Sequence, residues 1–107
     1  MATLTTRSTN GTSFHRHTVT CTVRDLMTIL GKPQGEYNTG EDKTNFDWNC
    51  ENDQGEVFTV YDWKMGRALD LDEYVEFHIG AESSQASYQA MIELNDMLYL
   101  ATKAGQI

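Results

Sequence analysis

The sequence predicts an α+β fold, with an antiparallel sheet of three to four strands, a short N-terminal helix and a long C-terminal helix. Three observations lead to this prediction. A turn sequence joins two segments that are dense in β-branched and aromatic residues. Residues 74–79 alternate polar and apolar side chains, and residues 84–101 carry an apolar stripe at helical spacing. A length of 107 residues suits one domain with these elements around a single core.

The N-terminal part is predicted to hold a tail and one strand. Residues 1–13 are rich in Thr, Ser, Asn and Gly and have little to bury, so we expect a flexible tail there. The single α+β domain then spans residues 14–107. The loose alternation of residues 14–21 predicts a short strand at the edge of the sheet.

A short helix follows directly. Thr22 is a suitable N-cap, and Asp25 stands at the third helical position, as in a capping box. The apolar residues fall at i, i+3, i+4 and i+7, and they are Val23, Leu26, Met27 and Leu30. Gly31 and Pro33 are expected to end the helix after about two turns.

A β-hairpin is the clearest element in the sequence. Phe46, Trp48 and Cys50 alternate with polar residues, which is typical of a half-buried strand. Residues 52–55, Asn-Asp-Gln-Gly, form a turn signal, and residues 57–63 follow as the second strand. We expect the two strands to pair antiparallel.

The C-terminal third is predicted to contain one strand and the long helix. Val75, Phe77 and Ile79 are expected to face the core. Ser83 or Ser84 caps the helix, and Gly105 ends it. The helix carries one apolar stripe, with Leu94 and Leu98 facing the sheet, and its members are Ala90, Met91, Leu94, Met97, Leu98 and Ala101.

The charge of the chain is unevenly distributed. The net charge is −8, yet residues 1–35 carry four basic residues against one acid, whereas residues 36–107 carry fifteen acids against four bases. Such an acidic body repels phosphate, so we expect no direct binding to nucleic acid. An acidic surface can also imitate nucleic acid toward a basic protein, or serve solubility alone.

No pattern for catalysis, a metal or a cofactor stands out, so we expect a protein that is not an enzyme. The candidate zinc ligands lack the usual spacing and would have to converge from three elements; they are His15, His17, Cys21, Cys50 and His78. A Cys50–His78 nucleophilic pair is disfavoured because Cys50 lies on the apolar side of its strand. The acids of residues 70–76 are more typical of a solvated turn than of an acid/base or Mg²⁺ site.

One segment suits the binding of a nucleotide. Tyr61 and Trp63 share one face of a strand, Lys64 and Arg67 follow its end, and His78 lies on a neighbouring strand. Aromatic rings stack on bases and cations meet phosphates, so these five residues form the candidate ligand site. The alternative interpretation is that the rings are ordinary sheet aromatics and the cations are simply solvated.

The chain has no apolar run long enough to span a membrane and no signal-peptide pattern, so we expect it in the cytoplasm. Cys21 and Cys50 are accordingly expected to be reduced, mostly buried thiols. The small core, together with the apolar stripe of the last helix, predicts self-association into a homodimer or a higher homo-oligomer.

Two resemblances add to this reading. The helix, loop and hairpin of residues 22–63 resemble the αββ unit of β-lactamase inhibitor protein, which implies a binding scaffold. More specific motifs resemble a set of small uncharacterised bacteriophage proteins, and they are Leu-Gly-Lys-Pro at residues 30–33, Asp-Trp at 47–48, Tyr-Asp-Trp-Lys at 61–64 and Phe-His-Ile-Gly at 77–80. The chain departs from that pattern at Phe77, where the phage proteins have tryptophan, and at Ala81, where they have glycine.

The phage resemblance implies a protein that acts in the cytosol of a host bacterium. A small phage protein without catalytic motifs is expected to sequester a host molecule. The first expectation is a counter-defence sponge that binds a nucleotide-derived immune signal without cleaving it. The alternative is an acidic inhibitor that docks on a host defence protein, as a nucleic-acid mimic or a steric plug.

Overall fold

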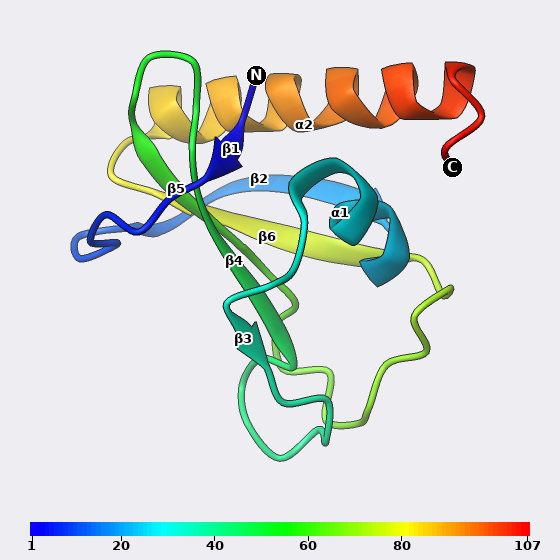
Figure 1. Ribbon diagram of the computed structural model, residues 1–107. Helices are drawn as coiled ribbons and strands as arrows, with labels where there is room; N and C mark the ends of the chain where they lie inside the picture. The colour runs from blue at the N-terminus through cyan, green and yellow to red at the C-terminus, as the bar shows by residue number, and fades with distance from the viewer.

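The computed structural model describes residues 1–107 as an α+β fold with two helices and a six-stranded antiparallel sheet (Figure 1). The elements are β1 (Thr3–Leu4), β2 (Ser13–Cys21), α1 (Val23–Leu30), β3 (Gly35–Glu36), β4 (Phe46–Glu51), β5 (Val57–Tyr61), β6 (Val75–Ala81) and α2 (Ser84–Lys103). The fold class and the long C-terminal helix were predicted from the sequence. Neither helix is both long enough and apolar enough to cross a membrane.

The sheet has more strands than the three to four predicted. Its order is β1-β4-β5-β6-β2, and β3 also pairs with β4. The two additional strands, β1 and β3, are two residues long and form antiparallel pairs with different parts of β4. A two-residue strand is too short to show an alternation of polar and apolar residues, so its sequence does not predict a strand. These two strands form only because their backbones hydrogen-bond to β4.

The predicted hairpin is confirmed, but its second strand ends at Tyr61 and not at Trp63, because the Asp62 carboxylate accepts hydrogen bonds from the amides of Asn45 and Phe46 there. β4 and β5 pair antiparallel, with Trp48 opposite Val60. In the turn, Asn52 accepts backbone hydrogen bonds from Gln54 and Glu56, and Gly55 adopts a φ of +76°, which a glycine tolerates without strain. This turn fixes the register, and the register decides which side chains face each side of the sheet.

Both helices cover one face of the sheet. Trp48, Phe58 and Phe77 are fully buried there and pack with Leu26 of α1 and Leu94 of α2. The predicted core-facing residues of β6, Val75, Phe77 and Ile79, are buried as expected. Trp48 also donates a hydrogen bond from Nε1 to the carbonyl of Gly31, which ties the hairpin to the end of α1. The opposite face has no helix and stays open.

The helix ends follow the capping signals of the sequence. Thr22 accepts a hydrogen bond from the amide of Asp25, and the Asp25 carboxylate accepts one from the amide of Thr22. Ser83 caps α2 by accepting a bond from the amide of Ala86. Within α2, Leu94 is fully buried, whereas Leu98 is half-buried at the margin of the core.

The segment predicted to be a tail makes defined contacts. Ala2 is buried, β1 pairs with Cys50 and Glu51 of β4, and the Arg7 guanidinium donates to the Glu51 carboxylate and the Gly55 carbonyl. The flexibility of residues 1–13 stays a prediction. The predicted strand of residues 14–21 is confirmed as the edge strand β2, which carries an irregularity between Phe14 and Thr18.

Candidate functional site

The open face of the sheet presents two rows of side chains. Strand pairing aligns Asp47, Tyr61 and His78 in one row. It aligns Asn49, Thr59 and Gly80 in the next row. These residues alternate with the buried core residues, so they point away from both helices. The open face is therefore polar and aromatic where the other face is apolar.

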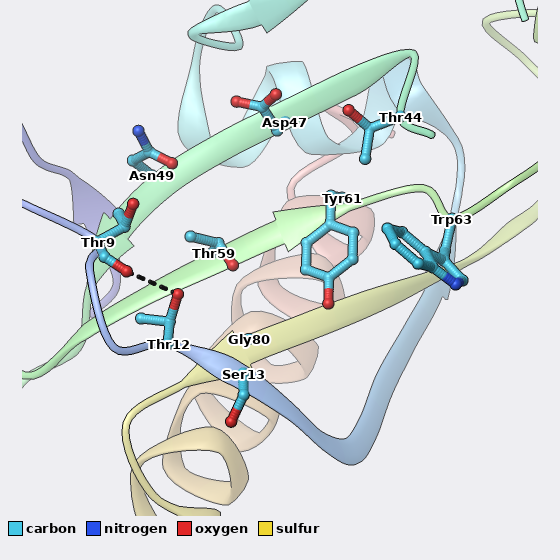
Figure 2. Close-up of a pocket in the computed structure, with 10 residues that line it drawn as sticks. All are labelled: Thr9, Thr12, Ser13, Thr44, Asp47, Asn49, Thr59, Tyr61, Trp63 and Gly80. Carbon is cyan, nitrogen blue, oxygen red and sulfur yellow. Dashed lines mark hydrogen bonds between the residues drawn. The ribbon is translucent and has the colours of Figure 1, made fainter. Parts of the chain in front are cut away.

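A groove with a volume of about 460 Å³ lies over these rows (Figure 2). Residues of the N-terminal segment form one side of it, where Thr12 donates a hydrogen bond to the carbonyl of Thr9 at 2.8 Å. The lining is mostly hydroxyl-bearing, and its members are Thr9, Thr12, Ser13, Thr44, Asp47, Asn49, Thr59, Tyr61, Trp63 and Gly80. Asp47 is the single charged residue among them.

Gly80 makes room in this groove. A Cβ at position 80 would lie 2.6 Å from Thr59 Oγ1 and 3.5 Å from Tyr61 Cε1. The backbone of Gly80 is not left-handed, so the glycine is required for space and not for its dihedral angles. Because Gly80 has no side chain, the side chains of Thr59 and Tyr61 can lie over its backbone.

Four rings meet at one end of the open face, and we call Phe14, Tyr61, Trp63 and His78 the aromatic cluster. Phe14 stacks on His78 at a centroid distance of 4.1 Å, and Trp63 stacks on the same ring at 6.4 Å. Tyr61 meets Trp63 and His78 edge-on at 5.9 and 5.7 Å. Phe14 and Trp63 remain 41% and 40% exposed, so the cluster offers aromatic surface to the solvent.

Lys64 lies directly beside this cluster. Its Nζ is 5.2 Å from the centroid of the Trp63 ring, within the range of a cation–π contact. The residue has a left-handed φ of +52°, and its amide donates to the Lys43 carbonyl at 2.7 Å. This backbone turn, three residues beyond the end of β5, folds the lysine back over the tryptophan.

The His78 ring is neutral near pH 7. Burial lowers its pKa below the usual value, and the nearby Glu76 opposes that shift only in part. An unperturbed histidine gains a proton as the pH falls below about 6.5. In the structure, protonation sets in at lower pH because Phe14 and the neighbouring rings exclude water from the ring.

Arg67 is the one predicted site residue that the structure does not bring to the cluster or the groove. Its guanidinium forms two hydrogen bonds with the Glu73 carboxylate, at 2.7 and 2.8 Å. The pairing lowers the pKa of Glu73 to about 2 and raises that of Arg67. Arg67 thus completes an ion pair within its own loop, where Gly40 packs so closely on its backbone that a Cβ would overlap.

Asp62 is a site residue that the sequence reasoning missed. The fully buried carboxylate accepts hydrogen bonds from the amides of Asn45 and Phe46 and from the Asn45 side chain, at 2.8 to 3.1 Å. Asn45 in turn accepts from the Gly40 amide and donates to the Arg67 carbonyl. Asp62 therefore holds both loops beside Trp63. Residues 58, 60 and 62 lie on the same side of the chain if the alternation of the strand continues, and Phe58 and Val60 are apolar. This alternation could have predicted that Asp62 is buried.

Asp47 provides the negative charge of the groove. Burial raises its pKa above the ordinary carboxyl value, a backbone hydrogen bond from Gly35 opposes the shift, and the charge of Asp62 adds to it. A Cβ at position 35 would overlap the carboxylate, so Gly35 lets the Asp47 side chain lie flat against β3. The carboxylate is thereby fixed as a hydrogen-bond acceptor at the groove.

The two cysteines are buried, as predicted, and both are free thiols. Burial raises the pKa of each to about 12, so neither forms a thiolate near pH 7. His15 and His17 are used in local contacts, to the Ala81 carbonyl and the Ser87 hydroxyl. No group of three or more potential metal ligands occurs in the structure.

Comparison with protein-family models, with curated proteins and with solved structures finds no match to this chain. The candidate site is accordingly defined by its own geometry: a hydroxyl-lined groove, one carboxylate, an exposed aromatic cluster and one adjacent lysine.

Proposed function

We propose that this chain is a non-enzymatic binding protein that holds a nucleotide-derived ligand on the open face of its sheet. The observation that carries the proposal is the aromatic cluster at the end of the groove. Trp63 and Phe14 each retain about two-fifths of their surface for contact, and stacking on such rings is the common way to bind a base. The groove volume falls in the range of small-molecule sites.

The charges of the site suggest how the ligand is oriented. Lys64 lies at the Trp63 end and supplies the cation for a phosphate. Asp47 lies among the hydroxyl-bearing residues of the groove and repels phosphate, but a carboxylate is a good acceptor for ribose hydroxyls. We infer a ligand with few phosphates, with its base and phosphate near Trp63 and its ribose toward Asp47.

The resemblance to phage proteins gives the biological setting of the proposal. A ligand that is bound and not cleaved is removed from circulation, so a phage protein of this kind would act as a sponge for an immune signal in the host cytosol. Cyclic oligonucleotides and cyclic ADP-ribose variants are the candidate signals. Of these, the ADP-ribose type has a ribose whose 2′- and 3′-hydroxyls are both free, whereas each ribose of a cyclic oligonucleotide keeps only one, so it offers the Asp47 carboxylate more donors while its base stacks on Trp63.

Isothermal titration calorimetry tests this function with a panel of cyclic dinucleotides, cyclic trinucleotides and ADP-ribose derivatives. We expect at least one of them to bind and to be recovered intact by chromatography. Trp63→Ala should weaken that binding by about 1 to 3 kcal/mol because a stacked base is lost. Tyr74→Ala is the matched control, since Tyr74 is 75% exposed and lies outside the cluster.

Three outcomes would redirect the proposal. An absence of heat across the panel at high micromolar concentration would favour the alternative, an acidic inhibitor that docks on a host defence protein. Recovery of cleaved ligand would identify an enzyme. An equal loss of affinity in Trp63→Ala and Tyr74→Ala would show that the ligand binds elsewhere.

A further inference from the structure

The outer side of α2 carries a second ridge of side chains, separate from the stripe that faces the sheet. Tyr88 is 51% exposed with its ring 5.6 Å from that of His17 on β2, and Tyr99 is 55% exposed with Lys103 Nζ 5.5 Å from its ring centroid. Ile92 is half-buried without packing against the core. The spacing along this ridge alternates between three and four residues, as at the a and d positions of a coiled coil. We call Gln85, Tyr88, Ile92, Asn95, Tyr99 and Thr102 the outer ridge.

The outer ridge contains no charged residue, although the chain as a whole is rich in charge. The 20 residues of α2 include only Glu93, Asp96 and Lys103 as charged side chains, and Glu93 is buried against the Asp53 amide. Depletion of charge together with exposed tyrosine is the composition found at the centre of protein interfaces. The ridge thus differs from the acidic remainder of the surface.

The ridge is complementary to itself when two copies run antiparallel. Aligning Tyr88 with Tyr99 of a second copy also aligns Ile92 with Asn95 and Gln85 with Thr102. The same alignment brings Lys103 beside Glu82 of the second copy, at both ends of the helix pair. Both residues are exposed in one copy, and Lys103 Nζ there contacts only the Tyr99 ring of its own chain, so this arrangement creates two opposite-charge pairs along the margin.

We propose that this protein forms a two-fold homodimer by antiparallel packing of α2 against α2 of a second copy. The interface is isologous, since each contact occurs twice about the axis. The helices cover the face of the sheet opposite the groove, so dimerisation leaves both grooves open. The inference is therefore independent of the proposed ligand.

Sedimentation equilibrium tests the interface through its charge pairs. We expect the wild-type protein to exceed the 12.1 kDa of one chain as concentration rises through the micromolar range. Ile92→Lys should raise the dissociation constant by at least about tenfold because it places a charge at the centre of the ridge. Lys103→Glu should also weaken the dimer, and the swap Glu82→Lys with Lys103→Glu should restore it.

Lys32→Glu is the matched control for Lys103→Glu, because it makes the same change in net charge at an exposed lysine outside α2. It should leave the dissociation constant near the wild-type value. A single 12.1 kDa species for the wild type at all concentrations would overturn the proposal. So would an Ile92→Lys variant that associates as tightly as the wild type.

Cysteine cross-linking tests the direction of the helices. Tyr88→Cys and Tyr99→Cys chains are mixed and oxidised, and the antiparallel pairing predicts disulfides between the two different chains. Each variant alone should stay uncross-linked, since like positions lie about 16 Å apart along the axis at 1.5 Å per residue, beyond the reach of a disulfide. Cross-linking within each variant alone would show parallel helices, and no cross-linking in the mixture would exclude this register.

Discussion

The two faces of the sheet are built from the same strands but have opposite properties. On the covered face, Trp48, Phe58 and Phe77 are fully buried under the helices. On the open face, the intervening residues leave a groove of about 460 Å³. The period of two in a strand places both sets within a few residues of each other. The comparison shows that the covered face holds the fold, while the open face is free to carry polar and aromatic groups for binding.

The largest expected effect is a difference in the free energy of unfolding between a substitution on the covered face and one on the open face. Phe77→Ala should lower the free energy of unfolding by about 3 to 5 kcal/mol, because it removes a fully buried ring and leaves a cavity. Glu76→Ala, the neighbouring exposed position on the same strand, should change it by less than about 0.5 kcal/mol. Urea melts measure both. Similar losses at the two positions would contradict the assignment of the faces.

A second effect concerns ligand affinity. Asp47→Asn keeps the shape of the side chain but removes its charge, so a ribose-containing ligand should bind about 1.5 kcal/mol more weakly through loss of charge-assisted hydrogen bonds. Calorimetry with the ligand identified from the panel measures this change. Tighter binding by the variant would mean that a phosphate lies against Asp47 and that the inferred orientation is reversed.

The covered face was predictable from the sequence because burial imposes a pattern. The capping box at Thr22, the turn at residues 52–55 and the apolar alternation of β4 and β6 each follow local rules, and the structure confirms them. The short strands β1 and β3 were missed because their pairing depends on the free edge of β4 and not on their own residues.

The open face was predictable only in part. Tyr61 and His78 lie together because strand register pairs them, and Trp63 and Lys64 join them just beyond the end of β5. Phe14 joins them through pairing of β2 with Gly80, a long-range contact that no local pattern indicates. Arg67 was expected at the site because it follows the strand closely in the sequence. It lies instead in a loop, and its guanidinium turns toward the nearest carboxylate, that of Glu73.

A smaller effect is the pH dependence that His78 confers. Its pKa is lower in the folded protein than in the unfolded chain, so protons bind the unfolded state more readily. The stabilisation is complete above about pH 6.5, the ordinary histidine value. It is lost as the pH falls from there through the folded pKa. His78→Gln should flatten this part of the stability profile in urea melts at a series of pH values, and an unchanged slope would show that the ring titrates normally.

The smallest expected effect concerns the turn at Lys64. Lys64→Gly removes the charge but relieves a left-handed φ of +52°, so its stability should equal or exceed that of Lys64→Ala by up to about 1 kcal/mol. Both variants should bind a charged ligand equally weakly. Thermal melts and calorimetry separate the two contributions, and greater stability of the alanine variant would contradict the strained turn.

The central claim is that the ligand stacks on the open face and leaves the covered face undisturbed. The two tryptophans report on the two faces, because Trp48 is fully buried in the core and Trp63 is 40% exposed in the aromatic cluster. Labelling with 5-fluorotryptophan gives one ¹⁹F resonance for each, assigned with a Trp63→Phe variant. Titration with the ligand should shift the Trp63 resonance and leave that of Trp48 in place. A binding event that shifts Trp48 alone, or neither resonance, would contradict the account.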